Sequence, residues 1–121
     1  MPDWSIKIVA GENPGDPAAF VPDLEGANPG DPLVASRGDL VSWNNTTRDR
    51  HRPWPAGSDF APVLPESSVP RQSKYYLSDP IPPDDSSRPS WVVSPPASGN
   101  TIFYCCLLHP EEHGQIQIAT S

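Results

Sequence analysis

The chain is poor in positive charge, and this shortage excludes one class of partner. Eight lysines and arginines stand against fifteen aspartates and glutamates, so the formal net charge is −7. Arg48, Arg50 and Arg52 lie close together, but Asp49 interrupts them. Because a nucleic-acid backbone is bound by clustered Lys and Arg, we expect no nucleic-acid partner. The acidic surface favours a basic protein partner, or it serves only to keep the chain in solution.

Long apolar segments and common hydrolase motifs are missing too. No run of about 18 apolar residues occurs, so we expect no membrane-spanning helix. The first residues, Met1-Pro2-Asp3, lack the features of a signal peptide, which fits either a mature secreted protein with an added methionine or a cytoplasmic protein. No G-x-S-x-G, H-E-x-x-H or phosphate-binding glycine motif appears. Hydrolase chemistry is therefore not indicated.

The abundance of proline predicts an all-β protein. Eighteen prolines and eight glycines in 121 residues leave little room for long helices, because proline breaks helix interiors. A proline-rich chain is also compatible with disorder, but four tryptophans, three tyrosines and several β-branched runs argue for a packed core. We predict a single folded domain over residues 1–121.

Period-two patterns locate the strands of this domain. In the first pattern, Trp4, Ile6 and Ile8 alternate with polar residues, as in a half-buried strand. Residues 52–70 read as a loop, and the string Asn-Pro-Gly-Asp-Pro at 13–17 recurs at 28–32 as a second, similar turn. About seven short strands between turn signals predict a sandwich or barrel. The clearest candidate strands cover residues 4–8, 40–43, 73–77, 91–94, 101–106 and 115–119.

Both cysteines lie next to each other, at Cys105 and Cys106. Neighbouring residues of a strand point to opposite faces, so only one of them can face a given site. A disulfide across the sandwich is excluded by their number, and a disulfide between neighbours is strained. The pair therefore indicates at least one functional thiol.

The histidines gather around these thiols in the sequence. His109 follows Cys106 with the spacing C-x2-H, His113 comes four residues later, and His51 lies far upstream. Isolated histidines are often ordinary surface residues. One thiolate with two imidazoles, however, is the trigonal ligand set of blue-copper sites, so the pattern favours a metal site.

Two segments resemble the cupredoxin family, in particular its amicyanin and plastocyanin-like members. Residues 104–114 are similar to the family's copper loop, Y-x-C-x-x-H-P-x-M-x-G, and residues 38–45 are similar to its G-D-x-V-x-W-x-N segment. The resemblance covers residues 33–119. It implies a Greek-key β-sandwich of about seven or eight strands, with one copper ion per chain bound by His51, Cys106 and His109. In this alignment Cys106 takes the ligand position and Cys105 a variable one, where it is either a free, oxidisable thiol or a small apolar residue.

The chain departs from the family at the fourth ligand. The family's weak axial methionine is absent, since the only methionine is Met1. Glu112 takes the aligned position, with His113 beside it as the less favoured candidate; if neither binds, the position is open or holds water. A carboxylate or imidazole is a harder donor than a thioether and favours Cu(II). We therefore predict a lowered reduction potential and a site that resembles that of the red copper protein nitrosocyanin.

Residues around the candidate ligands are harder to assign. Asn44 or Asn45 would hydrogen-bond across to the 104–114 segment and hold it, or would act as turn residues. Trp54 would cover the edge of His51, or would be a simple core or surface tryptophan.

The resemblance implies electron transfer with a redox protein as partner, through a carrier rather than an enzyme, with His109 as the point where the electron leaves. It also implies a periplasmic or extracellular location. The alternative is a copper-dependent protein that binds, converts or senses a small molecule such as nitric oxide or oxygen. Copper storage is disfavoured, because carriers of Cu(I) prefer soft ligands. Zinc also fits a Cys-His-His-Glu set, but it would leave the family resemblance unexplained.

Overall fold

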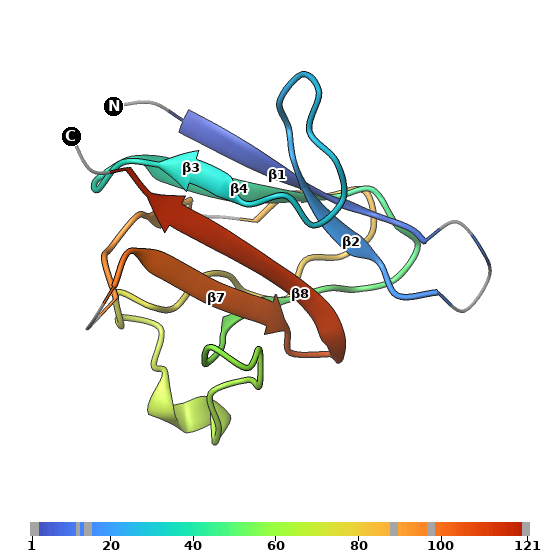
Figure 1. The fold of residues 1–121 in the computed structure, drawn as a ribbon. Helices are drawn as coiled ribbons and strands as arrows, with labels where there is room; N and C mark the ends of the chain where they lie inside the picture. The colour runs from blue at the N-terminus through green and yellow to red at the C-terminus, as the bar shows by residue number, and fades with distance from the viewer. Residues whose placement is uncertain (1–2, 12, 14–15, 88–89, 97–98, 120–121) are drawn as a thin grey trace.

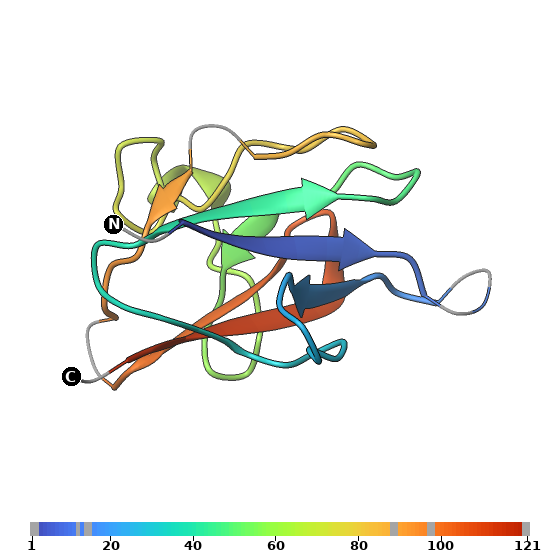
Figure 2. The same ribbon diagram turned by 90° about the horizontal axis from the view of Figure 1, so that it is seen from above.

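The chain folds into two four-stranded β-sheets packed face to face, which confirms the predicted sandwich (Figures 1 and 2). This computed structural model describes residues 3–11, 13, 16–87, 90–96 and 99–119. The first sheet has the order β2-β1-β4-β6 and the second the order β3-β8-β7-β5. The first sheet contains β1 (Asp3–Val9), β2 (Ala19–Pro22), β4 (Leu40–Asn45) and β6 (Trp91–Val92). The second contains β3 (Leu33–Ala35), β5 (Pro53–Pro55), β7 (Thr101–Cys106) and β8 (His109–Ile118).

Alternating side chains of β1 and β4 build the first sheet's half of the core. Ile6 and Ile8 of β1 are buried, as are Val41, Trp43 and Asn45 of β4. The two strands run parallel, and Ile6 lies opposite Trp43. Because side chains of a strand alternate between its faces, this register turns the apolar set of both strands toward the second sheet.

Several segments differ from the sequence-based expectation, among them β3, which was not predicted as a strand. Residues 73–77 form consecutive turns in place of a strand, with Ser73 and Tyr76 donating backbone hydrogen bonds to residues three positions earlier. β2 was not expected, since a four-residue segment that ends in Pro22 carries little strand signal. β5 lies inside the predicted 52–70 loop. It is an edge strand, a position that tolerates proline because no donor is needed on the open side.

The first and fourth residues of the two Asn-Pro-Gly-Asp-Pro strings are bonded in the same way, although residues 14 and 15 of the first predicted turn lie outside the described residues. In each, the backbone N–H of the aspartate donates to the carbonyl of the asparagine three residues earlier. In each, the aspartate side chain accepts a hydrogen bond from that asparagine's backbone N–H, at 3.1 Å for Asp16 and 2.9 Å for Asp31.

The C-terminal hairpin is tighter than the predicted loop. β8 begins at His109 rather than near residue 115, and only Leu107 and Leu108 form the turn after β7. Cys105 pairs with His113, whereas Cys106 pairs with His109, so residues 110–112 face no residue of β7. This interruption of the register brings the candidate ligands of β8 beside the end of β7.

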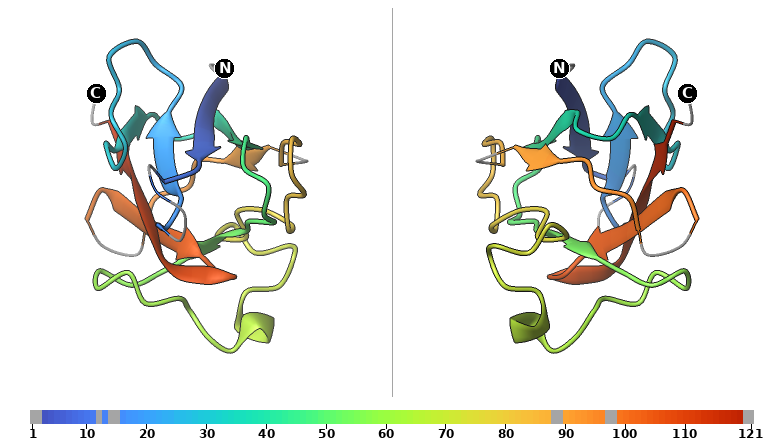
Figure 3. Two further views of the ribbon diagram at one scale, coloured as in Figure 1. Left: turned by 90° about the vertical axis from the view of Figure 1, so that its right-hand side faces the viewer. Right: turned by 90° about the vertical axis from the view of Figure 1, so that its left-hand side faces the viewer.

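An irregular segment covers the outer side of the second sheet at β7 and β5. The chain from residue 56 to 76, which includes a short 3-10 helix at Glu66–Ser68, lies outside this sheet (Figure 3). Trp54 is buried beneath it and stacks edge-on against Tyr76. In the part of the chain that the structure describes, no helix has the length and apolar composition needed to cross a membrane.

Candidate metal centre

The fold brings four side chains from separate positions in the sequence to one end of the sandwich. One ligand atom each from His51, Cys106, His109 and Glu112 lies within 4.8 Å of the others. His51 comes from the connection between β4 and β5, Cys106 from the end of β7, and the other two from β8. These are the four residues that the sequence singled out as metal ligands.

Backbone pairing fixes the position of His51. Its N–H donates to the carbonyl of Ile81 at 3.1 Å, and its own carbonyl accepts from the Ile81 N–H at 2.7 Å. Asn45 holds the loop that leads to His51. Its side-chain amide donates to the Asp49 carbonyl at 2.7 Å, and its side-chain oxygen accepts from the Thr47 N–H at 2.9 Å. Asn45 therefore acts as a turn residue of this loop. The alternative interpretation, a hydrogen bond from Asn45 to the 104–114 segment, does not hold.

Strand alternation separates the two cysteines. Cys106 belongs to the core between the sheets, while Cys105 lies on the outer face opposite Trp54. Burial, together with the neighbouring Cys106, raises the pKa of Cys105 to about 11, so its thiol stays protonated at neutral pH. Trp54 also lies on this outer face, beneath the Arg52 guanidinium at 4.5 Å, and does not cover the edge of His51.

The same alternation separates Glu112 from His113. His113 pairs with Cys105 on the outer face and stacks on Phe60 with a ring separation of 4.5 Å. Glu112 therefore points to the opposite side, and only 4% of it is exposed. The structure thus places Glu112 in the cluster and His113 outside it.

The spacing of the donor atoms suits a metal ion. The Cys106 sulfur lies 3.6 Å from Nδ1 of His51 and 3.5 Å from Nδ1 of His109. With metal–sulfur and metal–nitrogen bonds of about 2.3 and 2.0 Å, an angle of about 110–120° at the metal requires a sulfur–nitrogen distance of about 3.5–3.7 Å. Both measured distances meet that requirement.

The Glu112 carboxylate completes the cluster on one side. Its Oε1 lies 2.9 Å from Nδ1 of His51 and 3.8 Å from Nδ1 of His109. Despite this proximity, Oε1 is buried without an aligned hydrogen bond. Donor atoms that are close but not aimed at one another are the arrangement expected where several groups face a shared ion.

The groups around His51 favour its protonated form in the metal-free protein. Burial by itself would lower the pKa of His51, but the Cys106 sulfur and the Glu112 carboxylate outweigh burial and raise this pKa to about 9. Since metal binding requires the neutral imidazole, an arriving metal displaces a proton from His51.

Two backbone amides that the sequence did not reveal orient the cluster. The Arg52 N–H points at the Cys106 sulfur from 3.3 Å. The Ala18 N–H, just before β2, donates to Oε2 of Glu112 at 2.9 Å and leaves Oε1 to face the histidines. Every residue type carries a backbone N–H, so no signal in the sequence marks these two positions.

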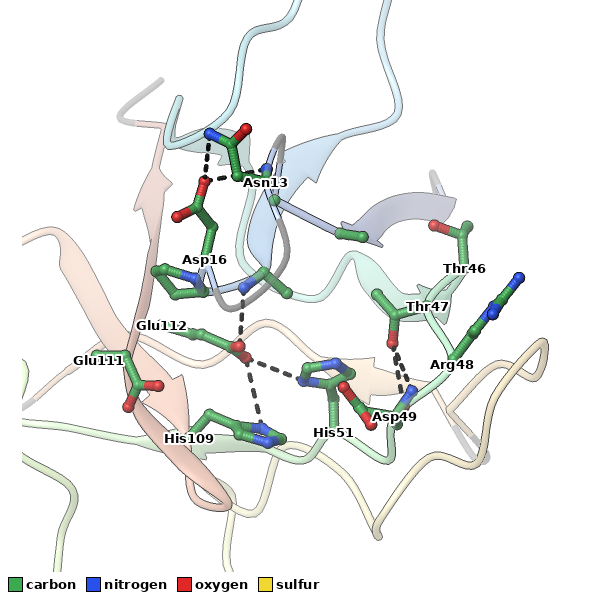
Figure 4. A pocket seen from close by; sticks show the side chains of 14 residues that line it. Asn13, Asp16, Thr46, Thr47, Arg48, Asp49, His51, His109, Glu111 and Glu112 are labelled. Atoms are coloured by element: carbon green, nitrogen blue, oxygen red, sulfur yellow. Dashed lines mark hydrogen bonds and ion pairs between the residues drawn. The ribbon is translucent and has the colours of Figure 1, made fainter.

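A cavity of about 650 Å³ opens beside the cluster (Figure 4). His51, His109 and Glu112 form its floor, and Asp16, Asp49, Glu111 and Arg48 are among the charged groups of its wall. His109 is the most accessible member of the cluster, with 34% of its side chain exposed. Solvent and small molecules thus reach the cluster from the side of His109.

Comparison with solved structures identifies the fold. The chain superimposes on a purple cupredoxin from Nitrosopumilus maritimus with a TM-score of 0.63 and 16% identity, over 95% of this chain and 98% of the other. It superimposes on a reduced Cu(I) form of an amicyanin variant with a TM-score of 0.55 and 14% identity, over 98% of this chain and 84% of the other. No family model and no curated protein sequence matches the chain. At these identities, the comparisons show that the chain has the cupredoxin fold.

Proposed function

We propose that this cupredoxin-fold chain binds one copper ion through His51, Cys106, His109 and Glu112 and serves as a one-electron carrier. The observation that carries the proposal is the convergence of one sulfur, two imidazole nitrogens and one carboxylate oxygen within 4.8 Å. The four donor atoms lie at one end of a fold shared with a purple cupredoxin and an amicyanin.

The donor set suits copper, and the cupredoxin fold favours copper over other metals. A thiolate with two imidazoles in one plane is the ligand set of blue-copper centres, whereas structural zinc sites are closed tetrahedra. Copper bound here would supply a Cu(II)/Cu(I) couple that gains or loses one electron. A zinc ion also satisfies the four donors, and the titration described below distinguishes the two metals.

The chain's own groups hold the site in one geometry. The backbone pair with Ile81 fixes His51, and the hairpin register fixes Cys106 against His109. The Arg52 N–H stabilises negative charge on the Cys106 sulfur. Ligands positioned by sheet hydrogen bonds need little rearrangement when the charge at the centre changes, and small rearrangement favours rapid electron transfer.

Glu112 sets this site apart from the methionine-containing pattern of the family. A carboxylate stabilises the more highly charged Cu(II), so we propose a lowered reduction potential and a red rather than blue centre. The Ala18 N–H on Oε2 supports binding through Oε1 alone. His113 is not retained as a ligand in this proposal, because it lies on the outer face of the hairpin.

We further propose that the electron enters or leaves near His109. Asp16, Asp49 and Glu111 surround the cavity at this edge, so a redox protein with a basic docking surface would match it. A periplasmic or extracellular location is part of the same proposal and rests on the family resemblance of residues 33–119.

Titration of the reduced, metal-free protein with Cu(II), followed by visible absorption, tests the copper site. An intense thiolate-to-copper band that saturates at one equivalent is expected. Cys106→Ser should abolish the band, and Glu112→Met should shift it and raise the reduction potential. A protein that takes up zinc but gives no band with Cu(II) would overturn the proposal.

A second function is supported by the cavity itself. An electron carrier needs only a close approach to its partner, yet here a cavity of about 650 Å³ leads to His51, His109 and Glu112. Such a space suits a small ligand such as nitric oxide or oxygen at the metal. Azide added to the Cu(II)-loaded protein should then change the absorption and electron paramagnetic resonance spectra saturably, and unchanged spectra would leave electron transfer alone.

A further inference from the structure

Three arginines and a tyrosine form a positively charged hollow on a molecule that is otherwise acidic. We define the arginine surface as Arg50, Arg52, Arg71 and Tyr76, which line a hollow of about 480 Å³ together with Asp79, Pro80 and Pro82. The chain has eight lysines and arginines in total, and three of them line this hollow.

Two guanidinium groups of the arginine surface, those of Arg52 and Arg71, are held by neighbouring side chains. Arg52 donates to the Ser78 carbonyl at 3.2 Å and to the Tyr76 hydroxyl at 2.9 Å, and it also pairs with Glu66. Arg71 lies over the Tyr76 ring at 5.9 Å and pairs with Asp79 at 3.0 Å. Arginines ordered before binding lose less conformational entropy when a carboxylate approaches, which is why arginine recurs at the energetic centres of interfaces.

Exposed guanidinium groups remain available to a partner. The Arg71 side chain is 72% exposed, and Arg50 is also exposed. The carboxylates of Asp79 and Glu66 pair with Arg71 and Arg52, so the excess positive charge at the arginine surface is that of one guanidinium group. The cavity beside His109 has the opposite character, with Asp16, Asp49 and Glu111 in its wall.

The arginine surface is connected to the candidate metal centre through a single residue. The backbone N–H of Arg52 faces the Cys106 sulfur at 3.3 Å, and the side chain of the same residue lines the hollow. His51, a candidate ligand, lies between Arg50 and Arg52 in the chain. A partner seated on the arginine surface would thus contact a residue whose backbone faces the Cys106 sulfur.

We propose that the arginine surface is the docking site for the acidic face of a one-electron redox protein. The proposal rests on the proposed copper function, because the partner must lose the single electron that the centre gains, or the reverse. The acidic rim at His109 would then serve a partner of the opposite charge. Two docking faces would allow the chain to receive an electron from one protein and pass it to another.

Hexaglutamate, a peptide of six glutamates, tests docking without copper. The metal-free, nitrogen-15-labelled protein is titrated at low ionic strength, and shifts are expected at the amides of Arg50, Arg52, Arg71 and Tyr76. Arg50→Gln with Arg71→Gln should weaken binding about five- to tenfold, which lies within the range for two exposed charge pairs. Lys7→Gln with Arg37→Gln is the matched control, since it also removes two positive charges but leaves the arginine surface intact.

Copper-loaded protein gives the second measurement. Oxidation of the reduced protein by hexacyanoferrate(III), which takes up the one electron released, should slow about fivefold in the Arg50/Arg71 variant and change little in the control. Equal weakening of hexaglutamate binding in both variants would overturn the proposal, because net charge alone would then explain it. Inorganic phosphate that binds as tightly as hexaglutamate would also overturn it, in favour of a small-anion site. Failure of copper binding leaves the hexaglutamate result intact, so the two proposals can fail separately.

Discussion

The two faces of β7 carry the same residue type in opposite roles. On the inner face, Cys106 lies in the core between the sheets, beside His51, His109 and Glu112. On the outer face, Cys105 is equally buried, but it lies against Trp54 beneath the 56–76 segment. Neither burial nor residue type distinguishes the two thiols. What distinguishes them is which groups the fold places within bonding distance.

The two faces also differ in their hydrogen-bonding environment. The inner sulfur has an N–H donor and two imidazoles within 3.6 Å. Burial, together with the neighbouring Cys106, raises the pKa of the outer thiol to about 11. Cys106 therefore lies among groups suited to chemistry, whereas Cys105 contributes to packing.

Replacing each cysteine in turn should give the largest contrast between the faces. Cys106→Ser is expected to weaken Cu(II) binding by about a hundredfold or more and to remove the thiolate-to-copper band, because it deletes a proposed ligand. Cys105→Ser should leave both nearly unchanged. Competition against a chelator of known affinity measures the Cu(II) affinity of the two variants. Equal losses of affinity would show that the two faces are not functionally distinct.

The free energy of unfolding should respond differently to substitutions on the two faces, at Gly114 and at His113 of β8. Gly114 lies against Tyr104 on the inner face, and an added Cβ would come within 2.3 Å of the tyrosine ring. Gly114→Ala is therefore expected to lower the free energy of unfolding by about 1–3 kcal/mol through overpacking. His113→Ala, on the exposed outer face, should cost about 0.5 kcal/mol or less.

Urea denaturation of the metal-free protein measures both changes without interference from the metal. A Gly114→Ala variant as stable as the His113→Ala variant would contradict the close packing of Tyr104 against β8.

A smaller effect is expected from the amide that orients Glu112. Ala18→Pro removes the N–H that donates to Oε2 at 2.9 Å, whereas Ala18→Gly keeps it. Loss of this support should weaken metal binding about tenfold, within the range for groups that orient ligands. The visible spectrum should shift toward that of Glu112→Gln in the proline variant only. Identical spectra in both variants would assign Ala18 a packing role.

Between about pH 6.5 and 9, the melting temperature of the metal-free protein should depend on His51, which lies on the inner side of the sheet. The pKa of His51 is raised from 6.5 to about 9, so the charged imidazole stabilises the folded state. This contribution is complete below about pH 6.5 and is lost as the pH rises through about 9. The melting temperature of the metal-free protein should therefore fall over that interval, and His51→Gln should remove the decline. Copper affinity should rise over the same interval, as His51 gives up its proton more readily.

The outer thiol should respond only at higher pH. In the Cys106→Ser variant, alkylation of Cys105 by iodoacetamide should be slow at pH 7 and accelerate toward pH 11, since the thiolate is the reactive form and burial raises the pKa. Rapid alkylation at pH 7 would show that the outer cover opens readily.

Much of the fold could be predicted from local patterns. The alternation of Ile6 and Ile8 and that of Val41 and Trp43 predicted β1 and β4, because one buried face imposes a period of two. Short or proline-rich strands such as β2 and β5 escaped prediction. Their pairing depends on neighbours that are distant in the sequence, and local propensity carries little of that information.

By itself, the sequence determined which residue types are available for chemistry. Two adjacent cysteines, three histidines and Met1 as the only methionine indicated a metal site with one thiol and histidine ligands. The resemblance to the cupredoxin copper loop then implied Cys106 as the sulfur ligand, with His51 and His109 as the imidazole ligands. It also implied Glu112, with His113 as the less favoured candidate, at the fourth position.

Only the tertiary structure placed Glu112 inside the cluster and His113 outside it. The register of β8 against β7 skips residues 110–112, and a strand side chain faces inward or outward according to that register. The supporting amides of Ala18 and Arg52 and the gathering of the arginine surface likewise depend on segments that meet only in the folded chain. Contacts between distant segments are set by packing of the whole sandwich, and no local pattern encodes them.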